Sequence, residues 1–261
     1  MENEHPRLSV VIPAYNEADR IGPTLLTIDK YLSEQDYPYE ILVVIDGAKD
    51  NTAEVVEGLQ GTIENLRFLN NTENHGKGYV VRQGLLEARG TWRLFTDADN
   101  STDISNVEKM WPLTEKGYKV VISSRDSKDA PGGGQTVKQP FPKRMVGNTS
   151  NILIQLVGVW GIWDTQNGFK MFHREAVEEI FSRAHIDRWG FDIEALALAR
   201  KLDYKIGKVG IMWRNDPRSH VKLKGYLNTF VELFKIRLNL LTGKYDVSTS
   251  RKEEPTAGQH S

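Results

Sequence analysis

The chain has 261 residues, of which 39% are hydrophobic and 26% are charged, a mixture typical of a globular protein with one large α/β domain or two small ones. Its formal net charge of −1 gives no electrostatic reason to expect a nucleic acid as its partner. The absence of cysteine excludes disulfides, thiolate chemistry and cysteine zinc sites.

No stretch of the sequence predicts a segment that crosses a membrane. The N-terminus begins with acidic residues and lacks an apolar signal core, so we do not expect export. The longest uncharged apolar run, 152–163, is too short to span a bilayer. We therefore expect a soluble or peripheral protein, located in the cytoplasm or on the cytoplasmic face of a membrane.

The first half of the chain alternates short β-branched runs with helical patterns, which is typical of a mainly parallel sheet with helices on both faces. This pattern predicts an α/β fold. The expected strands are 8–13, 41–45, 66–69, 92–95 and 119–123. The expected helices are 21–33, one that Asn51-Thr52 can cap, one that ends near 88, and 104–116.

Polar clusters follow four of these strands, at 13–17, 46–50, 74–78 and 97–101. In a parallel sheet the carboxyl ends of the strands share one edge, and ligands bind outside that edge. Four clusters at one edge therefore predict a binding site there.

The clearest chemical signal is Asp97-Ala98-Asp99, directly after the fourth strand. Residues two apart in an extended chain point the same way, so both carboxylates can face one spot. Two carboxylates with open positions suit Mg²⁺ or Mn²⁺, which also take waters and substrate phosphates. Alone, such a short motif is more often a solvated acidic loop, and it is the neighbouring clusters that favour a metal site.

The second half of the chain changes character after Arg125. Residues 127–142 are rich in glycine and proline and predict a flexible loop, of the kind that forms lids or binding loops. The apolar segment 152–163 is predicted to be helical and partly exposed. A polar turn at 164–168 then precedes a strand at 169–172, a helix at 174–182, a helix that begins within 189–194 and ends near 202, and a last strand at 205–213.

An amphipathic helix is predicted at 227–241, with apolar residues at helical spacing: Leu227, Phe230, Val231, Phe234, Leu238 and Leu241. Lys235 and Arg237 lie among them. We expect this helix to pack on its own domain, with an interfacial helix resting on a membrane as the alternative. The polar composition of 247–261 predicts a disordered tail.

Several motifs together resemble family 2 glycosyltransferases, and more narrowly the polyprenyl-phosphate hexose synthases, among them the dolichyl-phosphate β-glucosyltransferases. They are SVVIPAYNEADRI, VVIDGAKDNT, NHGKGYVVRQG, FTDADNST, SSRD, DTQNGFKMF and WGFDIE. Each motif alone is weak, but their order and spacing from about 8 to 225 are specific. The resemblance implies a GT-A (Rossmann-like) fold in one domain, 1–246, with a nucleotide half of about 8–125 and an acceptor half of about 126–246.

The resemblance also implies an inverting transfer of a hexose to a polyprenyl or dolichyl phosphate at a membrane surface. The expected donor is UDP-glucose, with GDP-mannose as the alternative, and the expected cofactor is Mg²⁺ or Mn²⁺ held by Asp97 and Asp99. Two departures stand out. Ser101 lies where some relatives carry a glutamine that binds the metal, and the C-terminal membrane helices of many relatives have no counterpart here.

Matched residue by residue, the resemblance places Asp46 at the base and basic residues near the phosphates. Gln166 is a candidate for the sugar hydroxyls on its polar character alone. The residues expected around the nucleotide sugar are Pro13, Ala14, Tyr15, Glu17, Asp46, Lys77, Asp97, Arg125, Gln166 and Lys222. The residues expected to act in transfer are Lys77, Asp99, Asp164 and Arg218.

The role of Asp164 depends on the acceptor. A lipid phosphate is already an anion near neutral pH, so it needs no strong general base. A hydroxyl acceptor on a glycan or polysaccharide would need a carboxylate base, and Asp164 is the first candidate, although aspartate also caps turns. A nucleotide-sugar-binding module without turnover is a further alternative, which Asp97, Asp99 and Lys77 argue against.

Overall fold

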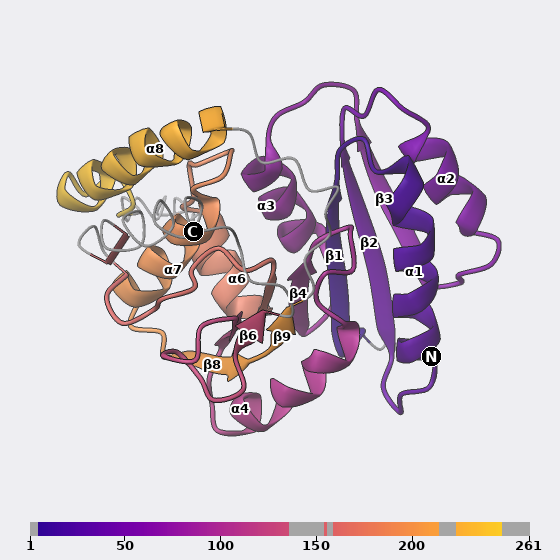
Figure 1. The fold of residues 1–261 in the computed structure, drawn as a ribbon, viewed down its shortest axis with the longest axis horizontal. Coiled ribbons are helices and arrows are strands. Elements are labelled where there is room, and N and C mark those ends of the chain that lie inside the picture. The colour runs from indigo at the N-terminus through magenta and orange to yellow at the C-terminus, as the bar shows by residue number, and fades with distance from the viewer. Residues whose placement is uncertain (1–4, 136–153, 156–158, 214–222, 247–261) are drawn as a thin grey trace, which may run out of the picture.

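The computed structural model describes residues 5–135, 154–155, 159–213 and 223–246. A seven-stranded sheet runs through them in the order β3-β2-β1-β4-β7-β5-β8 (Figure 1). Neighbouring strands are parallel, except that β7 runs antiparallel to β4 and β5. This confirms the predicted α/β class and mainly parallel sheet. The strands are β1 (Leu8–Ala14), β2 (Tyr39–Asp46), β3 (Leu66–Asn71), β4 (Trp92–Thr96), β5 (Val120–Ser124), β7 (Phe169–His173) and β8 (Ile206–Gly210).

Helices cover both faces of the sheet (Figure 1). Successive side chains of a strand point to opposite faces, so β1 contributes Val10 to one core and Val11 to the other. The core around Val10 contains α1 (Ala18–Ser33), α2 (Thr52–Leu59), the 3₁₀ helix η1 (Ile104–Lys109) and α4 (Trp111–Glu115). The core around Val11 contains α3 (Lys77–Glu87), α6 (Arg174–Phe181), α7 (Phe191–Lys201) and α8 (Leu223–Leu241).

The reversed direction of β7 decides which residues reach the site. Because β7 is antiparallel, its first residue, Phe169, pairs with Thr96, the last residue of β4. The polar turn 164–168, which precedes β7, therefore lies at the edge where the parallel strands end. Asp164 and Asp97 reach the same edge from strands of opposite direction.

Two predicted elements are broken in the structure. The single helix expected at 104–116 is wrong: η1 ends at Lys109, and α4 restarts with Pro112 in its first turn. Proline has no amide hydrogen to donate to the preceding turn of a continuous helix. It is tolerated in the first turn, so a new helix begins there. The strand expected at 205–213 divides at Ile211 into β8 and β9 (Met212–Trp213), which pairs with β6 (Gly134–Gln135).

The prediction of a helix over 152–163 is also wrong for residues 159–163. Residues 159–163 form a turn in which Gly161 has a φ of 77°. The side-chain amide of Gln155 closes this turn, since it accepts a hydrogen bond from the Gly161 amide and donates one to the Ile162 carbonyl, both at 2.6 Å. Val159 and Ile162 are buried, whereas Trp160 is exposed.

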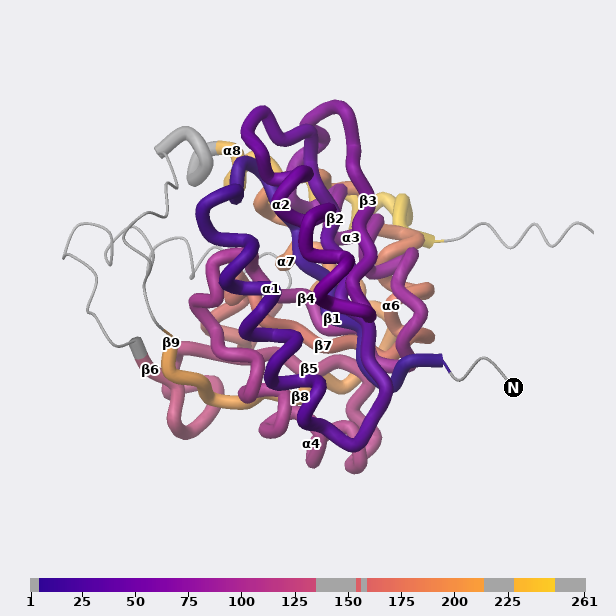
Figure 2. Tube along the Cα trace, turned by 90° about the vertical axis from the view of Figure 1, so that its right-hand side faces the viewer, coloured from indigo at the N-terminus to yellow at the C-terminus, as the bar shows by residue number. Residues whose placement is uncertain are grey.

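Helix α8 lies against α7, at the end of the molecule away from α1 and α2 (Figures 1 and 2). Leu233 and Ile236 face the core, while Val231, Phe234 and Leu238 face outward. The expectation that the helix packs on its own domain is confirmed, and Phe230 of the predicted stripe also lies against the core, but Val231, Phe234, Leu238 and Leu241 stay exposed. The helix carries two apolar faces, and periodicity does not tell which of them the fold covers. Among the described residues, no helix is long and apolar enough to cross a membrane.

Candidate active site

The centre of the site is an ion pair between the end of β4 and the start of α3. Lys77, the first residue of α3, places its Nζ 2.5 Å from Oδ1 of Asp97. The other oxygen of Asp97 lies against Gly168, where an added Cβ would come within 1.9 Å of Oδ2. Segments around 77, 97 and 168, far apart in sequence, thus meet at the edge predicted to bind the ligand.

Lys77 is held in its charged form. Burial alone would lower the pKa of Lys77, but the attraction of Asp97 and Asp192 outweighs it and raises the pKa above its ordinary value. The rings of Phe95 and Trp189 stand 5.4 Å and 5.5 Å from its Nζ. A permanently charged ammonium at this edge suits a phosphate ligand.

Asp99 shares a tight turn with Ser101. Its Oδ1 accepts a hydrogen bond from the Ser101 amide at 3.0 Å, and its side chain lines a shallow pocket beside α1. The pocket is formed by Asp19, Arg20, Pro23, Thr24, Thr27, Asp99 and Asn100. The buried hydroxyl of Ser101 has no hydrogen-bond partner among the described residues.

These residues fit a divalent cation. Asp97, Asp99 and the unpartnered hydroxyl of Ser101 offer oxygen ligands only, the type that Mg²⁺ and Mn²⁺ prefer. Within the described part of the chain, no three His, Asp or Glu side chains are grouped so that they could hold a metal by themselves. A cation bound by the two aspartates would therefore take its remaining ligands from water and from the phosphates of a substrate.

The loops after β1 and β2 are tied together. Asn16 Oδ1 accepts a hydrogen bond from the Lys49 amide at 2.7 Å, and Asp50 Oδ2 accepts one from the Ala18 amide at 3.1 Å. Pro13 and Ala14 are buried at the end of β1, which leaves the Tyr15 side chain exposed. Asp50, rather than the expected Asn51-Thr52, binds the first amide of α2 at 3.1 Å.

Glu17 stands between α1 and the aspartate pair. It forms hydrogen bonds of 2.6 Å and 2.7 Å with the guanidinium of Arg20. Burial raises the pKa of Glu17, hydrogen bonding to Arg20 opposes this, and the negative charges of Asp99 and Asp97 add to the increase. Glu17 is thus close enough to the aspartate pair to respond to its charge.

Asp46 holds the loop that leads into α3. Its carboxylate accepts hydrogen bonds from the side-chain amide of Asn74 at 2.9 Å and from the backbone amides of His75 at 2.7 Å and Gly76 at 3.0 Å. Position 76 requires glycine for two reasons: its φ is 107°, and an added Cβ would lie 2.5 Å from the Asp187 carbonyl oxygen. Asp46 thereby fixes the point from which Lys77 projects.

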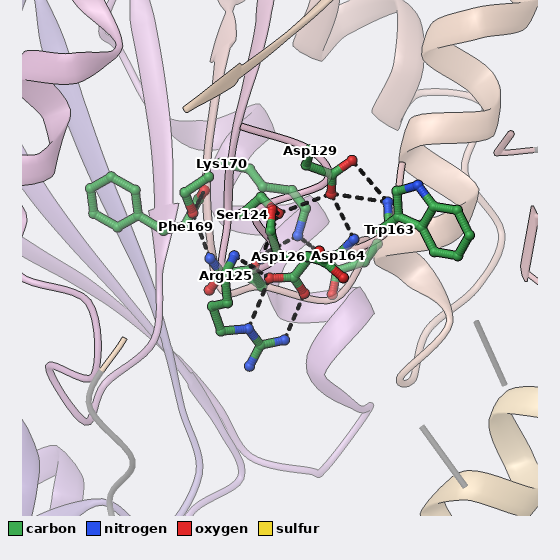
Figure 3. A network of polar contacts seen from close by, with 11 residues as sticks. Ser124, Arg125, Asp126, Asp129, Trp163, Asp164, Phe169 and Lys170 are labelled. Atoms are coloured by element: carbon green, nitrogen blue, oxygen red, sulfur yellow. Dashed lines mark hydrogen bonds and ion pairs between the residues drawn. The ribbon is translucent and has the colours of Figure 1, made fainter. Parts of the chain in front are cut away.

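Arg125 and Asp164 form a bidentate pair beside this centre (Figure 3). Asp164 Oδ2 accepts from the Arg125 amide at 2.7 Å and from Nε at 2.9 Å, and Oδ1 accepts from Nη2 at 2.7 Å. Burial would raise the pKa of Asp164, but the charge and hydrogen bonds of Arg125 outweigh it and lower the pKa below the ordinary 3.8. Asp164 is therefore ionised, and both of its carboxylate oxygens accept hydrogen bonds from Arg125.

Asp129 was not predicted from the sequence, although it supports this pair (Figure 3). Its Oδ2 accepts hydrogen bonds from the backbone amides of Trp163 and Asp164, both at 2.9 Å. Lys208 on β8 neutralises it at 3.1 Å. These contacts join residues 34 or more positions apart, which no local pattern reveals.

Lys170 and Asp192 form a buried pair that sequence reasoning also left without a role. Lys170 Nζ lies 2.6 Å from Asp192 Oδ1 and donates to the Asn167 carbonyl. Burial raises the pKa of Asp192, and the charges of Lys170 and Lys77 oppose the rise. The available signal was a lysine inside the buried run of β7, because a lysine there requires a partner.

The remaining polar residues of these motifs are placed as follows. Gln166 is exposed, and its Nε2 donates to the Trp189 carbonyl at 3.4 Å. Glu194 is buried and accepts hydrogen bonds from the amides of His185 and Ile186, both at 2.9 Å, so its task is structural. Arg218 and Lys222 lie outside the described residues, as does the expected tail 247–261.

Replacing Lys170 by methionine should destabilise the fold by about 3–5 kcal/mol, because it leaves the Asp192 carboxylate buried without its partner. Urea denaturation measures the change. Lys119→Met, which breaks the exposed pair with Glu175, is the matched control and should have little effect. Equal stability of Lys170→Met and the wild type would show that Asp192 does not depend on this ion pair.

Comparison with known proteins identifies the family. Residues 9–181 match the family model described as Glycosyl transferase family 2. Dolichyl-phosphate beta-glucosyltransferase ALG5D of Trichomonas vaginalis is 35% identical over 249 residues, which cover 90% of this chain and 75% of that protein. The human dolichyl-phosphate beta-glucosyltransferase is 32% identical over 261 residues, covering 94% of this chain and 79% of the relative.

Solved structures share the fold. Glucosyl-3-phosphoglycerate synthase from Mycobacterium tuberculosis, in complex with Mn²⁺, uridine-diphosphate and phosphoglyceric acid, superposes with a TM-score of 0.67 at 16% identity, over 94% of this chain and 80% of the other. A complex of the same enzyme with uridine-diphosphate gives 0.65 at 18% identity, over 89% and 80% of the two chains. With the family model matching most of the sequence, the chain is a member of glycosyltransferase family 2.

Proposed function

We propose that the chain transfers a hexose, glucose from UDP-glucose, to a dolichyl or polyprenyl phosphate with inversion at the sugar carbon, at the cytoplasmic face of a membrane. The observation that carries the proposal is the Lys77–Asp97 pair beside Asp99 and Ser101. The relatives named dolichyl-phosphate beta-glucosyltransferases support the choice of sugar and acceptor. GDP-mannose remains the second donor to test.

The choice of a nucleotide-sugar donor follows from the charges that the site can place on a diphosphate. When bound to Asp97 and Asp99, a divalent cation supplies Lewis-acid stabilisation of the departing diphosphate. Lys77 adds a charge-assisted hydrogen bond to the same group, and its raised pKa keeps it protonated through the reaction. The exposed ring of Tyr15, on the loop after β1, is free to contact the nucleotide.

The choice of a phosphate as acceptor follows from the ionised, hydrogen-bonded carboxylate of Asp164. Its low pKa and its three hydrogen bonds to Arg125 make it a poor proton acceptor. It serves instead to hold Arg125, whose guanidinium can receive an anion at the end of β5. An acceptor phosphate is already ionised, so its oxygen attacks the sugar carbon without a base while the bond to the nucleoside diphosphate breaks.

A hydroxyl acceptor is the second candidate, and a direct comparison separates the two. The protein is supplied with UDP-glucose, Mn²⁺ and either a short polyprenyl phosphate or the matching polyprenol. Transfer to the phosphate alone supports the proposal. Transfer to the alcohol alone would refute it and return the role of base to Asp164. Binding of the donor without transfer to either would favour a module without turnover.

The pH profile gives an independent prediction. Transfer to the phosphate acceptor should fall as pH drops through about 6, where the monoester gains its second proton. Asp164 cannot cause this decline because its pKa lies below 3.8. The contribution of Asp164 to stability is likewise present above 3.8 and is lost only as pH falls through its lower folded pKa, so this contribution does not change between pH 5 and 8.

The variant Asp164→Asn tests the assignment of that decline. It should transfer hexose more slowly, since Arg125 loses its charged anchor, yet kcat/KM for the acceptor should decline around the same pH. A ³¹P titration of the free acceptor supplies the reference pKa. Disappearance of the decline in Asp164→Asn would mean that Asp164 is the titrating base.

A further inference from the structure

Helix α8 presents an apolar stripe that the described residues leave uncovered. The side chains of Val231, Phe234, Leu238 and Leu241 are 55%, 71%, 60% and 69% exposed. Their spacing places them along one side of the helix, opposite Leu233 and Ile236, which are buried. Four large apolar side chains in one row exceed the scattered exposure normal on a protein surface and indicate an interaction site.

The exposed charged residues that lie between members of the stripe are basic. Lys235 and Arg237 lie between its members and Lys244 follows the helix; all three are exposed. Of the nearby acidic side chains, Glu232 is buried, and Asp246 is paired with Lys201 at 2.9 Å. A chain with a formal net charge of −1 therefore carries a local face that is apolar and basic.

We infer that this face of α8 docks on an anionic lipid bilayer, with the four apolar side chains in the interface and the basic residues at the headgroups. Basic residues near an interfacial helix attract anionic lipids. A second copy of the chain fits less well, because a two-fold contact would set Lys235 and Arg237 against themselves. The inference rests on the proposed function in one respect: a polyprenyl phosphate acceptor resides in a bilayer.

The buried side of α8 connects this face to the site. Glu232 Oε2 accepts a hydrogen bond from the Gly190 amide at 2.7 Å, in the turn before α7. The neighbouring Trp189 stands 5.5 Å from the Nζ of Lys77. Gly190 packs closely on α8, since an added Cβ at Gly190 would lie 2.9 Å from Glu232 Cβ. Docking of α8 thus sets how far the Lys77–Asp97 pair stands from the lipid surface.

Vesicle flotation of the full chain tests the inference. The wild type should float with vesicles of phosphatidylcholine and phosphatidylserine, and less with phosphatidylcholine alone. The double variant Phe234→Ser/Leu238→Ser should lose at least about tenfold in partitioning, because it removes two large apolar groups from the interface. Lys235→Gln/Arg237→Gln should lose the preference for phosphatidylserine.

Leu26→Ser is the matched control, because Leu26 is an exposed leucine on α1, which lies at the opposite end of the molecule from α8 (Figure 1). It should float like the wild type. Unchanged flotation of Phe234→Ser/Leu238→Ser would overturn the inference, as would a wild-type dimer that this variant converts to a monomer. Equal binding to neutral and anionic vesicles would refute the role of the basic residues.

The two proposals can fail separately. Flotation requires no turnover, so a chain that docks through α8 but transfers no hexose would refute the proposed function and leave the docking face intact. Conversely, transfer to a water-soluble short polyprenyl phosphate should be equal in wild type and Phe234→Ser/Leu238→Ser, whereas transfer to a long polyprenyl phosphate in anionic vesicles should fall with flotation.

Discussion

Replacing Asp99 by asparagine should lower metal-dependent hexose transfer by about 10²- to 10³-fold while leaving the fold intact. Asparagine keeps the side-chain oxygen that accepts the Ser101 amide at 3.0 Å, so the turn after β4 survives. What it removes is the negative charge that attracts the cation. Steady-state transfer across a range of Mn²⁺ concentrations measures the loss, and thermal unfolding checks the fold.

Asp103→Asn is the control for this experiment. Asp103 lies in the same loop and accepts the Ser105 amide at 2.9 Å as the cap of η1, with no contact to the aspartate pair. It undergoes the same chemical change and should transfer hexose normally. Wild-type transfer by a folded Asp99→Asn would rule out Asp99 as a metal ligand.

Adding a methyl group at Gly168 should also lower hexose transfer, because it displaces the carboxylate of Asp97. The added Cβ of Gly168→Ala would lie 1.9 Å from Oδ2 of Asp97, far inside contact distance. The carboxylate must rotate away, and its 2.5 Å contact with Lys77 is lost. A misplacement of about 1 Å in such a constellation lowers the rate by about 10²-fold. We expect that loss in kcat/KM, with a small change in melting temperature.

Gly58→Ala is the matched glycine substitution, because a Cβ at Gly58 on α2 meets nothing within 4 Å. It should retain full activity. If Gly168→Ala were as active as Gly58→Ala, the observed position of Asp97 would not be the one that transfer requires.

Local sequence patterns were sufficient for the parts of the fold that depend on near neighbours. The run that forms β1 is buried throughout, and burial on both faces is what a continuous β-branched stretch predicts. The placement of polar clusters at strand ends likewise brought Lys77 and Asp97 to one edge. Both inferences need only the period of a strand and the parallel direction of its neighbours.

The remaining features depend on contacts between distant segments. The short run of β7 has no pattern that encodes its direction, yet that direction brings Asp164 to the site edge. The partners of Lys170 and Asp129 lie on other elements, so each appeared in the sequence as an isolated charge. Helix α8 has apolar residues on two faces, and its sequence does not tell which face is buried. The buried face contains Leu233 and Ile236, whereas Phe234 and Leu238 are exposed.

The most direct test of the whole account is the transfer reaction itself. Purified protein is incubated with Mn²⁺ or Mg²⁺, radiolabelled UDP-glucose or GDP-mannose, and a short polyprenyl phosphate, and label is counted in the organic phase. We predict label from UDP-glucose that is lost when EDTA is added. Absence of lipid label while the donor still binds, or label that persists in EDTA, would contradict the proposed reaction.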